Sequence, residues 1–275
     1  MKRYGLNTYY RAGITGLIFL LGGVVVSAQD DVDRLSSVFD YIEQNRLDSA
    51  EITLIAVLKN KPDNPLNPFL LNNLGTIQRR QGKYDEALLS YTAALGTFPK
   101  QPVFLESRAA LFAEMGKTQN AIIDYSTLLD LNPGNEEALY QRGLLYLQIK
   151  NTDFAETDFR RMLELNPNSL SARRGFAALA KFRGDYEDAE KIYNYLLDKE
   201  PEDLNLYAGR AELFLLMEKP GRALTDINKA IRLSGDNPRN PYLYITRYRI
   251  KLLLHEKESA QNDLKKAIEL GYKME

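Results

Sequence analysis

One segment of this chain, Glu136–Ser169, sets the pattern for nearly everything that follows the amino terminus. Its small, aromatic and proline residues stand at fixed offsets: Gly143, Tyr146, Ala155, Phe159 and Pro167. Gly143 and Ala155 are small, as two antiparallel helices require where they cross closely. Tyr146 and Phe159 are large and fill the space around the crossing. The proline stops the second helix because it lacks an amide hydrogen. The segment is therefore expected to fold as one helix-turn-helix hairpin.

The same offsets recur along the chain and divide it into seven repeats with few insertions. In residue numbers these repeats are 31–64, 68–101, 102–135, 136–169, 170–203, 204–237 and 241–274. Their G-x2-Y, A-x3-F and P pattern resembles that of the 34-residue tetratricopeptide repeat family. The resemblance implies an all-α fold, a right-handed α-solenoid of about seven helix-turn-helix repeats. Gly82, Gly116 and Gly184 are expected to end first helices in the left-handed conformation.

Residues 1–28 differ in kind from the rest. Basic residues precede a largely apolar run from Ile14 to Val26, and the run ends in a Val-Ser-Ala sequence at Ala28. This is the pattern of a secretory signal peptide cleaved after Ala28. The run is shorter than the roughly 20 residues that a membrane-spanning helix needs, although retention as an anchor stays open as the alternative. The junction also resembles that of exported proteins of the Bacteroidota.

Export would place the mature chain in the periplasm, or against the inner face of the outer membrane, with no stable membrane insertion. The whole chain has 36 basic and 37 acidic residues, and the leader contains three of the basic ones and no acid. The mature chain is therefore acidic, which argues against nucleic acid as a partner.

The sequence holds no pattern of residues that indicates catalysis. It has no cysteine, which excludes disulfides and thiol chemistry, and it contains no phosphate-binding glycine loop, zinc ligand set or serine triad motif. The single histidine, His255, stands near a helix end beside charged residues and is read as solvated. We therefore expect no enzyme activity, no cofactor and no metal.

Four arginines recur at one position of the first helix, and an aspartate follows each of them sixteen residues later. These pairs are Arg108 with Asp124, Arg142 with Asp158, Arg210 with Asp226, and Arg247 with Asp263. The other three repeats lack both members. This covariation within one chain favours ion pairs that join the two helices of a hairpin over a basic surface for a partner.

In the family that this chain resembles, first helices line a concave groove that holds a peptide or a partner helix. By the repeat frame, the lining residues would be Asn72, Thr76, Arg79, Glu106, Tyr140, Leu144, Leu147, Arg174, Lys181, Glu212 and Leu215. The apolar centre formed by Tyr140, Leu144 and Leu147, flanked by cations, suits a peptide with an apolar anchor and nearby acidic groups. An alternative is that these side chains only pack against neighbouring helices.

The resemblance therefore implies a non-enzymatic scaffold that binds a protein or peptide, and the export signal would place it within a cell-envelope or secretion-related assembly. The alternative function is that of a membrane-anchored accessory subunit, which recruits a client to an enzyme or transport complex. The identity of the partner does not follow from the sequence.

Overall fold

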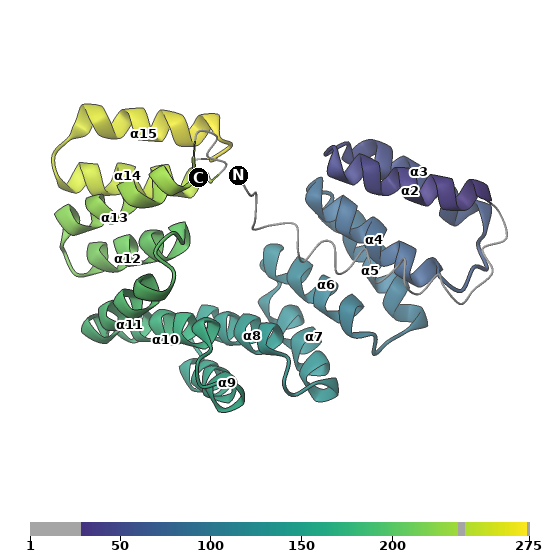
Figure 1. Cartoon of the computed structure of the whole chain (residues 1–275), viewed down its shortest axis with the longest axis horizontal. Helices are drawn as coiled ribbons and strands as arrows, with labels where there is room; N and C mark the ends of the chain where they lie inside the picture. The colour runs from purple at the N-terminus through teal and green to yellow at the C-terminus, as the bar shows by residue number, and fades with distance from the viewer. Residues whose placement is uncertain (1–28, 236–239, 274–275) are drawn as a thin grey trace. The chain divides into compact units, whose positions relative to one another are not determined.

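The computed structural model describes residues 29–235 and 240–273, and every regular element in these ranges is an α-helix. Fourteen helices lie there, and consecutive helices pair into antiparallel hairpins (Figure 1). The prediction of an all-α chain of about seven helix-turn-helix units is confirmed. The predicted signal peptide, residues 1–28, lies outside the described residues.

The chain divides into two compact units between Pro133 and Gly134, which we call unit 1 and unit 2. The helices of unit 1 are α2 (Gln29–Glu43), α3 (Leu47–Asn60), α4 (Asn67–Arg80), α5 (Tyr84–Thr97), α6 (Pro102–Glu114) and α7 (Thr118–Leu131). The helices of unit 2 are α8 (Glu136–Gln148), α9 (Thr152–Leu165), α10 (Leu170–Arg183), α11 (Tyr186–Lys199), α12 (Leu204–Leu216), α13 (Pro220–Leu233), α14 (Pro241–Leu253) and α15 (Lys257–Glu269).

Within unit 1, each second helix packs against the first helix of the next hairpin, so that α3 contacts α4 and α5 contacts α6. The core around α3 and α4 consists of apolar side chains with at most 6% of their surface exposed: Val38, Ala50, Leu54, Val57, Leu70, Leu74 and Ile77. Such a core grows along one dimension, because each hairpin buries its apolar face on the next one.

Unit 2 follows the same scheme, and its carboxyl end is closed by the chain itself. Leu270 and Tyr272 fold back onto the last core cluster, and the ring of Tyr272 meets that of Tyr242 edge-on at 6.1 Å between centroids. The residues that follow α15 thereby cover part of the apolar core formed by α12 to α15.

The ring of Phe159 explains why glycine stands at two positions of unit 2. Phe159 is fully buried, and a Cβ atom added to Gly143 on α8 would lie only 2.4 Å from its Cε1 atom. A Cβ atom on Gly175 of α10 would lie 2.4 Å from its Cδ1 atom. Real Cβ contacts are never that short, so both helices approach the ring through backbone alone. Gly143 was identified from the repeat pattern, and Gly175 was not.

The turn inside each hairpin contains one residue with positive φ. The expected glycines Gly82, Gly116 and Gly184 have φ values of 77°, 70° and 86°. The equivalent point in the other repeats holds a residue with a side chain, and φ lies between 56° and 62°: Asn45, Lys150, Glu218 and His255. The turn of the hairpin thus requires the left-handed conformation at this point. Residues with a side chain adopt it there too, although it costs them some conformational energy.

Candidate functional site

The structure brings together both members of all four arginine and aspartate pairs. In each, the arginine Nε and Nη2 atoms donate to the two carboxylate oxygens over 2.5–3.0 Å: Arg108 to Asp124, Arg142 to Asp158, Arg210 to Asp226, and Arg247 to Asp263. The aspartates are 3–4% exposed. Each pair joins the two helices of one hairpin in the bidentate geometry that arginine favours. These arginines are therefore occupied within the fold.

A second set of ion pairs joins neighbouring hairpins, and the sequence analysis missed it. The Glu51 carboxylate on α3 accepts from Lys83 Nζ at 2.6 Å and from Gln78 at 3.2 Å. At the equivalent position in unit 2, Glu156 accepts from Arg183 of the next hairpin at 2.7 Å. The third such residue is Glu190, which Arg222 Nη2 reaches at 2.7 Å. The available signal was a glutamate three residues before the large apolar position of the second helix (Leu54, Phe159 or Tyr193), with a cation near the turn of the next hairpin.

These pairs predict a pH-dependent loss of stability in Glu156→Gln. Hydrogen bonds from Arg183 and Arg160 hold the pKa of the Glu156 carboxyl below its ordinary value. A lowered native pKa gives stability that is present above the unfolded pKa and is lost as the pH falls through the native one. We expect Glu156→Gln to cost up to about 1 kcal/mol at pH 7, because the pair is partly solvated.

Urea unfolding of wild type and variant checks this at pH 7 and near pH 3. The difference in free energy of unfolding between wild type and variant should disappear at the lower pH. A difference of equal size at both pH values would contradict the assignment. Glu164→Gln is the matched control, because Glu164 pairs with Arg161 of its own helix and its side chain is 63% exposed.

In unit 1 the expected partner-contacting residues are mostly used inside the fold. Asn72 is only 7% exposed, and Thr76 forms a hydrogen bond with the hydroxyl of the buried Tyr91 at 3.1 Å. Arg79 lies 3.9 Å from the carboxylate of Glu114. The remaining residue of that set, Glu106, is half-buried. This side of unit 1 therefore offers a partner little apolar surface.

In unit 2 the corresponding positions form a face that we call the first-helix face. It comprises Tyr140, Leu144 and Leu147 on α8, Arg174 and Lys181 on α10, and Glu212 and Leu215 on α12. Helix α8 packs directly on α10, and the Lys181 ammonium lies 3.0 Å from the Glu212 carboxylate on α12, which joins the three helices. The three helices thus present one continuous surface.

The apolar centre of this face is smaller than the sequence suggested. Tyr140 and Leu144 are half-buried, whereas Leu147 is only 7% exposed and packs into unit 2. The Tyr140 ring lies 6.3 Å from that of Phe159, and burial raises the pKa of its hydroxyl. Tyr140 and Leu144, with the half-buried Leu215, are the apolar groups left for contact.

The cations of the first-helix face already have carboxylate partners. Arg174 Nη2 lies 2.5 Å from Glu200 and 2.6 Å from Asp203, and Lys181 is paired with Glu212. Burial alone would lower the pKa of Lys181, but its charged surroundings raise it, so the ammonium stays charged at neutral pH. The expectation that these cations are free to bind acidic groups of a partner is therefore corrected. Lys181 forms a neutral pair with Glu212, and Arg174 lies between two carboxylates in a group of net charge −1.

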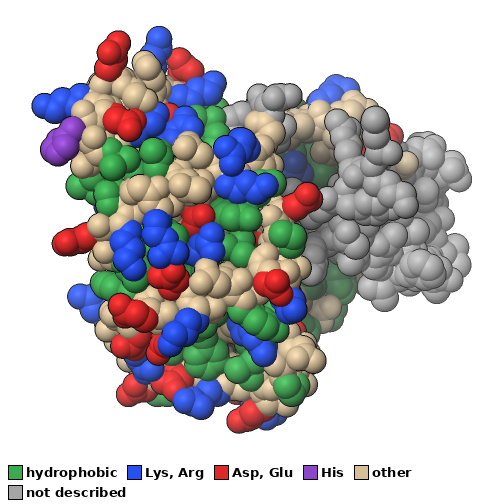
Figure 2. Space-filling view, turned by 60° about the vertical axis from the view of Figure 1, so that its left-hand side comes forward, with side chains coloured by type: hydrophobic (Ala, Val, Ile, Leu, Met, Phe, Trp, Pro, Cys, Tyr) green, Lys and Arg blue, Asp and Glu red, His purple; other side chains and the backbone are tan. Residues whose placement is uncertain are grey.

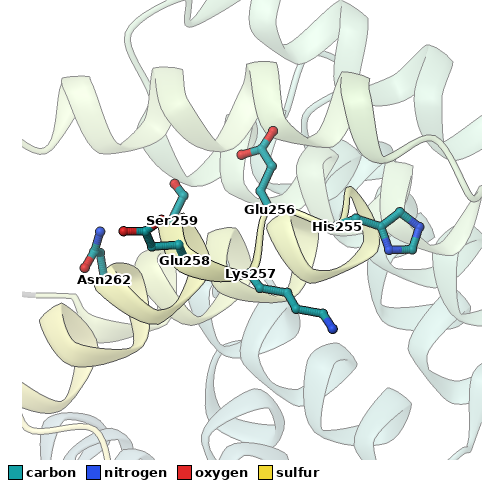
Figure 3. A pocket seen from close by; sticks show the side chains of 6 residues that line it. All are labelled: His255, Glu256, Lys257, Glu258, Ser259 and Asn262. Atoms are coloured by element: carbon teal, nitrogen blue, oxygen red, sulfur yellow. The ribbon is translucent and has the colours of Figure 1, made fainter.

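His255 and its neighbours do not form a catalytic arrangement. An open depression near the turn between α14 and α15 is lined by His255, Glu256, Lys257, Glu258, Ser259 and Asn262. Figure 3 shows Glu256 and Lys257 pointing to opposite sides and His255 pointing away from both. His255 is exposed, and it occupies the left-handed turn position, so its place in the chain has a structural reason.

The described ranges contain no group of three or more histidine, cysteine or acidic side chains that could hold a metal ion. No helix in them is both long enough and apolar enough to cross a membrane. On the face seen in Figure 2, basic, acidic and apolar side chains are interspersed.

Comparison with known proteins identifies the family. Models of the tetratricopeptide repeat match residues 136–169 and, separately, residues 40–102 and 176–238. A crystal structure of a tetratricopeptide repeat protein from Parabacteroides merdae is 47% identical, with a TM-score of 0.79, and the match covers 89% of this chain and 94% of that one. The chain belongs to the tetratricopeptide repeat family. Its relationship to a protein from the Bacteroidota agrees with the resemblance noted in the sequence.

More distant matches show the tetratricopeptide repeat fold alone. PilW, described as a widely conserved type IV pilus biogenesis factor, has a TM-score of 0.58 at 17% identity over 71% of this chain and 90% of its own. The pilF protein of Pseudomonas aeruginosa has a TM-score of 0.58 at 16% identity over 81% and 96%. No functionally curated protein matches the sequence.

Proposed function

We propose that this tetratricopeptide repeat protein is a non-enzymatic scaffold that binds a peptide or helix of a partner protein on the first-helix face of unit 2. The observation that carries the proposal is the pairing of Tyr140 and Leu144, which are apolar, half-exposed and adjacent on α8. Tyrosine is among the residues whose burial at the centre of a contact contributes most to affinity, and Leu144 extends the apolar surface beside it.

The surrounding ion pairs define the chemistry of the partner. Lys181 and Glu212 are paired with each other, and Arg174 is paired with two acids, so an added carboxylate would meet no free cation there. A partner segment should therefore place an apolar side chain over Tyr140 and Leu144, with polar neutral groups at the rim. Ion pairs that are already formed also lose little side-chain entropy on binding.

A location in the cell envelope is part of this proposal. It rests on the leader pattern of residues 1–28, with its apolar run and Val-Ser-Ala ending. A scaffold in the periplasm, or on the inner face of the outer membrane, would serve an envelope or secretion-related assembly. Amino-terminal sequencing of the protein from cells tests the location, because a start at Gln29 is expected. An intact leader would favour the membrane-anchored accessory subunit.

Substitutions on the first-helix face are expected to abolish partner capture without unfolding the protein. Leu144→Asp places an unpaired charge at the contact, and Tyr140→Ala removes its largest apolar group. We expect each to weaken capture from envelope extracts at least tenfold, while the helical circular dichroism and unfolding midpoint of Leu144→Asp stay close to wild type.

The matched control for this capture is Thr157→Asp on α9, which is exposed on a second helix of the same unit. It should leave capture unchanged. Equal capture by wild type, Leu144→Asp and Tyr140→Ala, all folded, would contradict the assignment of this face.

A further inference from the structure

Helix α14 presents an exposed face that the contact proposed above leaves unused. Tyr242, Arg249 and Leu253 follow one another on this helix at spacings of seven and four residues, so they share one face, and Leu252 flanks them. Tyr242 is 65% exposed, Leu253 58% and Leu252 38%, and Arg249 is exposed as well. We call these four residues the α14 patch. It is an apolar surface with one cation at its centre.

The α14 patch adjoins the first-helix face. Helix α12 contacts α14 directly, and Leu215 of the first-helix face packs against the core cluster that contains Leu243 and Ile250 of α14. Both helices belong to unit 2, and both are first helices of their hairpins. A partner segment that covers Leu215 can therefore extend onto α14.

The exposed apolar residue near the end of α14 is not required by the repeat. The residues of unit 1 at the repeat position of Leu253 are charged: Glu43, Arg80 and Glu114. At this position α10 and α12 have Phe182 and Leu216, which are 46% and 50% exposed although another hairpin follows each of them. The exposure of Leu253 is therefore not explained by the lack of a following hairpin. Apolar side chains exposed at one position of three successive hairpins indicate a contact surface.

Arg249 differs from the other cations on the first helices of unit 2. Its guanidinium has no hydrogen-bond or ion-pair partner among the described residues, whereas Lys251 on the same helix lies 2.7 Å from the Asp263 carboxylate. The remaining cations of these four helices in the described ranges all contact a carboxylate or a backbone carbonyl: Arg142, Arg173, Arg174, Lys181, Arg183, Arg210 and Arg247. Arg249 is thus the cation that this side of unit 2 leaves available to a partner.

The isolated charge restricts what can cover the patch. A partner that buries Tyr242 and Leu253 also takes Arg249, which lies between them, out of water. A guanidinium buried without a counter-charge is strongly unfavourable. An aspartate or glutamate side chain opposite Arg249 removes this cost, because a carboxylate accepts two hydrogen bonds from a guanidinium. The occupant should therefore be acidic at one point and apolar around it.

The spacing along α14 favours a helix as the occupant. A line of side chains along one face of a helix packs against the corresponding line on another helix. We propose that the α14 patch binds an amphipathic helical segment of a partner protein, with one acidic side chain on Arg249 and apolar side chains on both sides of that acid. This inference rests on the proposed function, because the patch extends the same face and adds a charge requirement at its α14 end.

Selection of displayed random peptides on the full chain tests the proposal with defined probes. Peptides that bind the wild type should contain one acidic residue flanked by apolar ones. Synthetic copies of these peptides should bind Arg249→Glu at least tenfold more weakly, because two like charges then face each other. Replacing the acid of the peptide by lysine should restore binding to that variant. Fluorescence anisotropy measures the dissociation constants, and circular dichroism verifies that the variant is folded.

A second arginine provides the matched control. Arg232 is exposed on α13, a second helix of the same unit, and its side chain has no partner among the described residues. Arg232→Glu makes the same change of charge and should leave the dissociation constants unchanged. Leu253→Asp should weaken binding of the selected peptides at least tenfold, because it places an unpaired charge in the apolar part of the patch.

The outcomes separate this inference from the proposed function. Peptides that require Leu144 and are indifferent to Arg249→Glu would overturn the α14 patch and leave the proposed function standing. Peptides that require Arg249 and are indifferent to Leu144→Asp would support the patch and contradict the contact at α8. A selection that yields no binding peptide, or a lysine exchange that restores nothing, would overturn the inference. Binding to phosphatidylglycerol vesicles that Leu253→Asp abolishes, with no peptide selected, would assign the patch to a lipid surface and overturn it too.

Discussion

Replacing Phe159 by alanine is expected to lower the free energy of unfolding of unit 2 by about 3–5 kcal/mol, the usual cost of emptying a fully buried phenylalanine site. The ring fills the space between α8 and α10, so its loss leaves a cavity that two helices border. Gly143 and Gly175 border the ring and carry no side chain that could fill part of that cavity. Urea denaturation followed by circular dichroism measures the effect.

A rescue experiment distinguishes the close packing from general destabilisation. Gly175→Ala should cost about 1–3 kcal/mol, because its Cβ would lie 2.4 Å from the ring of Phe159. In a Phe159→Leu background the ring is gone, and the same substitution should become neutral or favourable, since alanine stabilises a helix relative to glycine by about 1 kcal/mol.

Gly221→Ala on α13 is the matched control for this rescue, because a Cβ there would meet no atom within 4 Å. It should be neutral or slightly stabilising. If Gly175→Ala costs no more than Gly221→Ala in the wild-type background, the account of the helix crossing is wrong.

The second large effect is expected from Arg142→Ala, with a loss of about 3–5 kcal/mol at pH 7. Asp158 is 3% exposed, so removal of Arg142 leaves a buried carboxylate without its counter-charge. Asp158→Ala should cost less, because the Arg142 side chain is 20% exposed and can turn its charge to water. The losses should be less than additive in the double variant.

The pH dependence of the Arg142→Ala variant checks the cause. Burial raises the pKa of the Asp158 carboxyl, and the hydrogen bonds from Arg142 oppose that rise in the wild type. Without Arg142 the native pKa should rise further above the unfolded one. The native state then binds the proton more tightly than the unfolded state does. The loss in free energy of unfolding relative to wild type should therefore become smaller as the pH falls through the native pKa.

Removal of an exposed ion pair is the control for Arg142→Ala. Arg161 and Glu164 lie 2.9 Å apart on α9, with side chains 46% and 63% exposed, and Arg161→Ala should change stability by less than about 0.5 kcal/mol. Additive losses for Arg142→Ala and Asp158→Ala would contradict the paired arrangement.

The sequence was sufficient for features that repeat at fixed spacing within one chain. The hairpins follow from the recurring small, aromatic and proline residues. Across the repeats, arginine at the position of Arg142 occurs together with aspartate at the position of Asp158. This correlation can be seen within a single sequence. Gly143 was identified because it occupies the small-residue position of the repeat frame.

Features that depend on a neighbouring hairpin could not be read in the same way. Gly175 lies outside the frame position for small residues, and its reason is the ring of Phe159 on the preceding hairpin. The sequence indicates that Lys181 is a free cation, but the structure pairs it with Glu212 on the neighbouring hairpin. Leu147 reads as a surface residue, although the packing of unit 2 buries it. Each of these requires the stacking geometry in addition to the repeat pattern.

The residues at the hairpin turns show a second limit. Glycine signals the left-handed position clearly at Gly184, because it adopts positive φ at no steric cost. Lys150, Glu218 and His255 adopt it too, and their residue types give no such signal. An alignment of the seven repeats would have placed these residues at the same repeat position as Gly184.

We propose that this scaffold binds its partner through the first-helix face of unit 2, and site-specific photo-crosslinking in living cells tests this contact most directly. A photoreactive amino acid at Leu144 should form a covalent adduct with a second protein. The same group at Thr157, on a second helix of the same unit, should form none. Folded protein that gives no adduct from Leu144, or equal adducts from both positions, would contradict the claim.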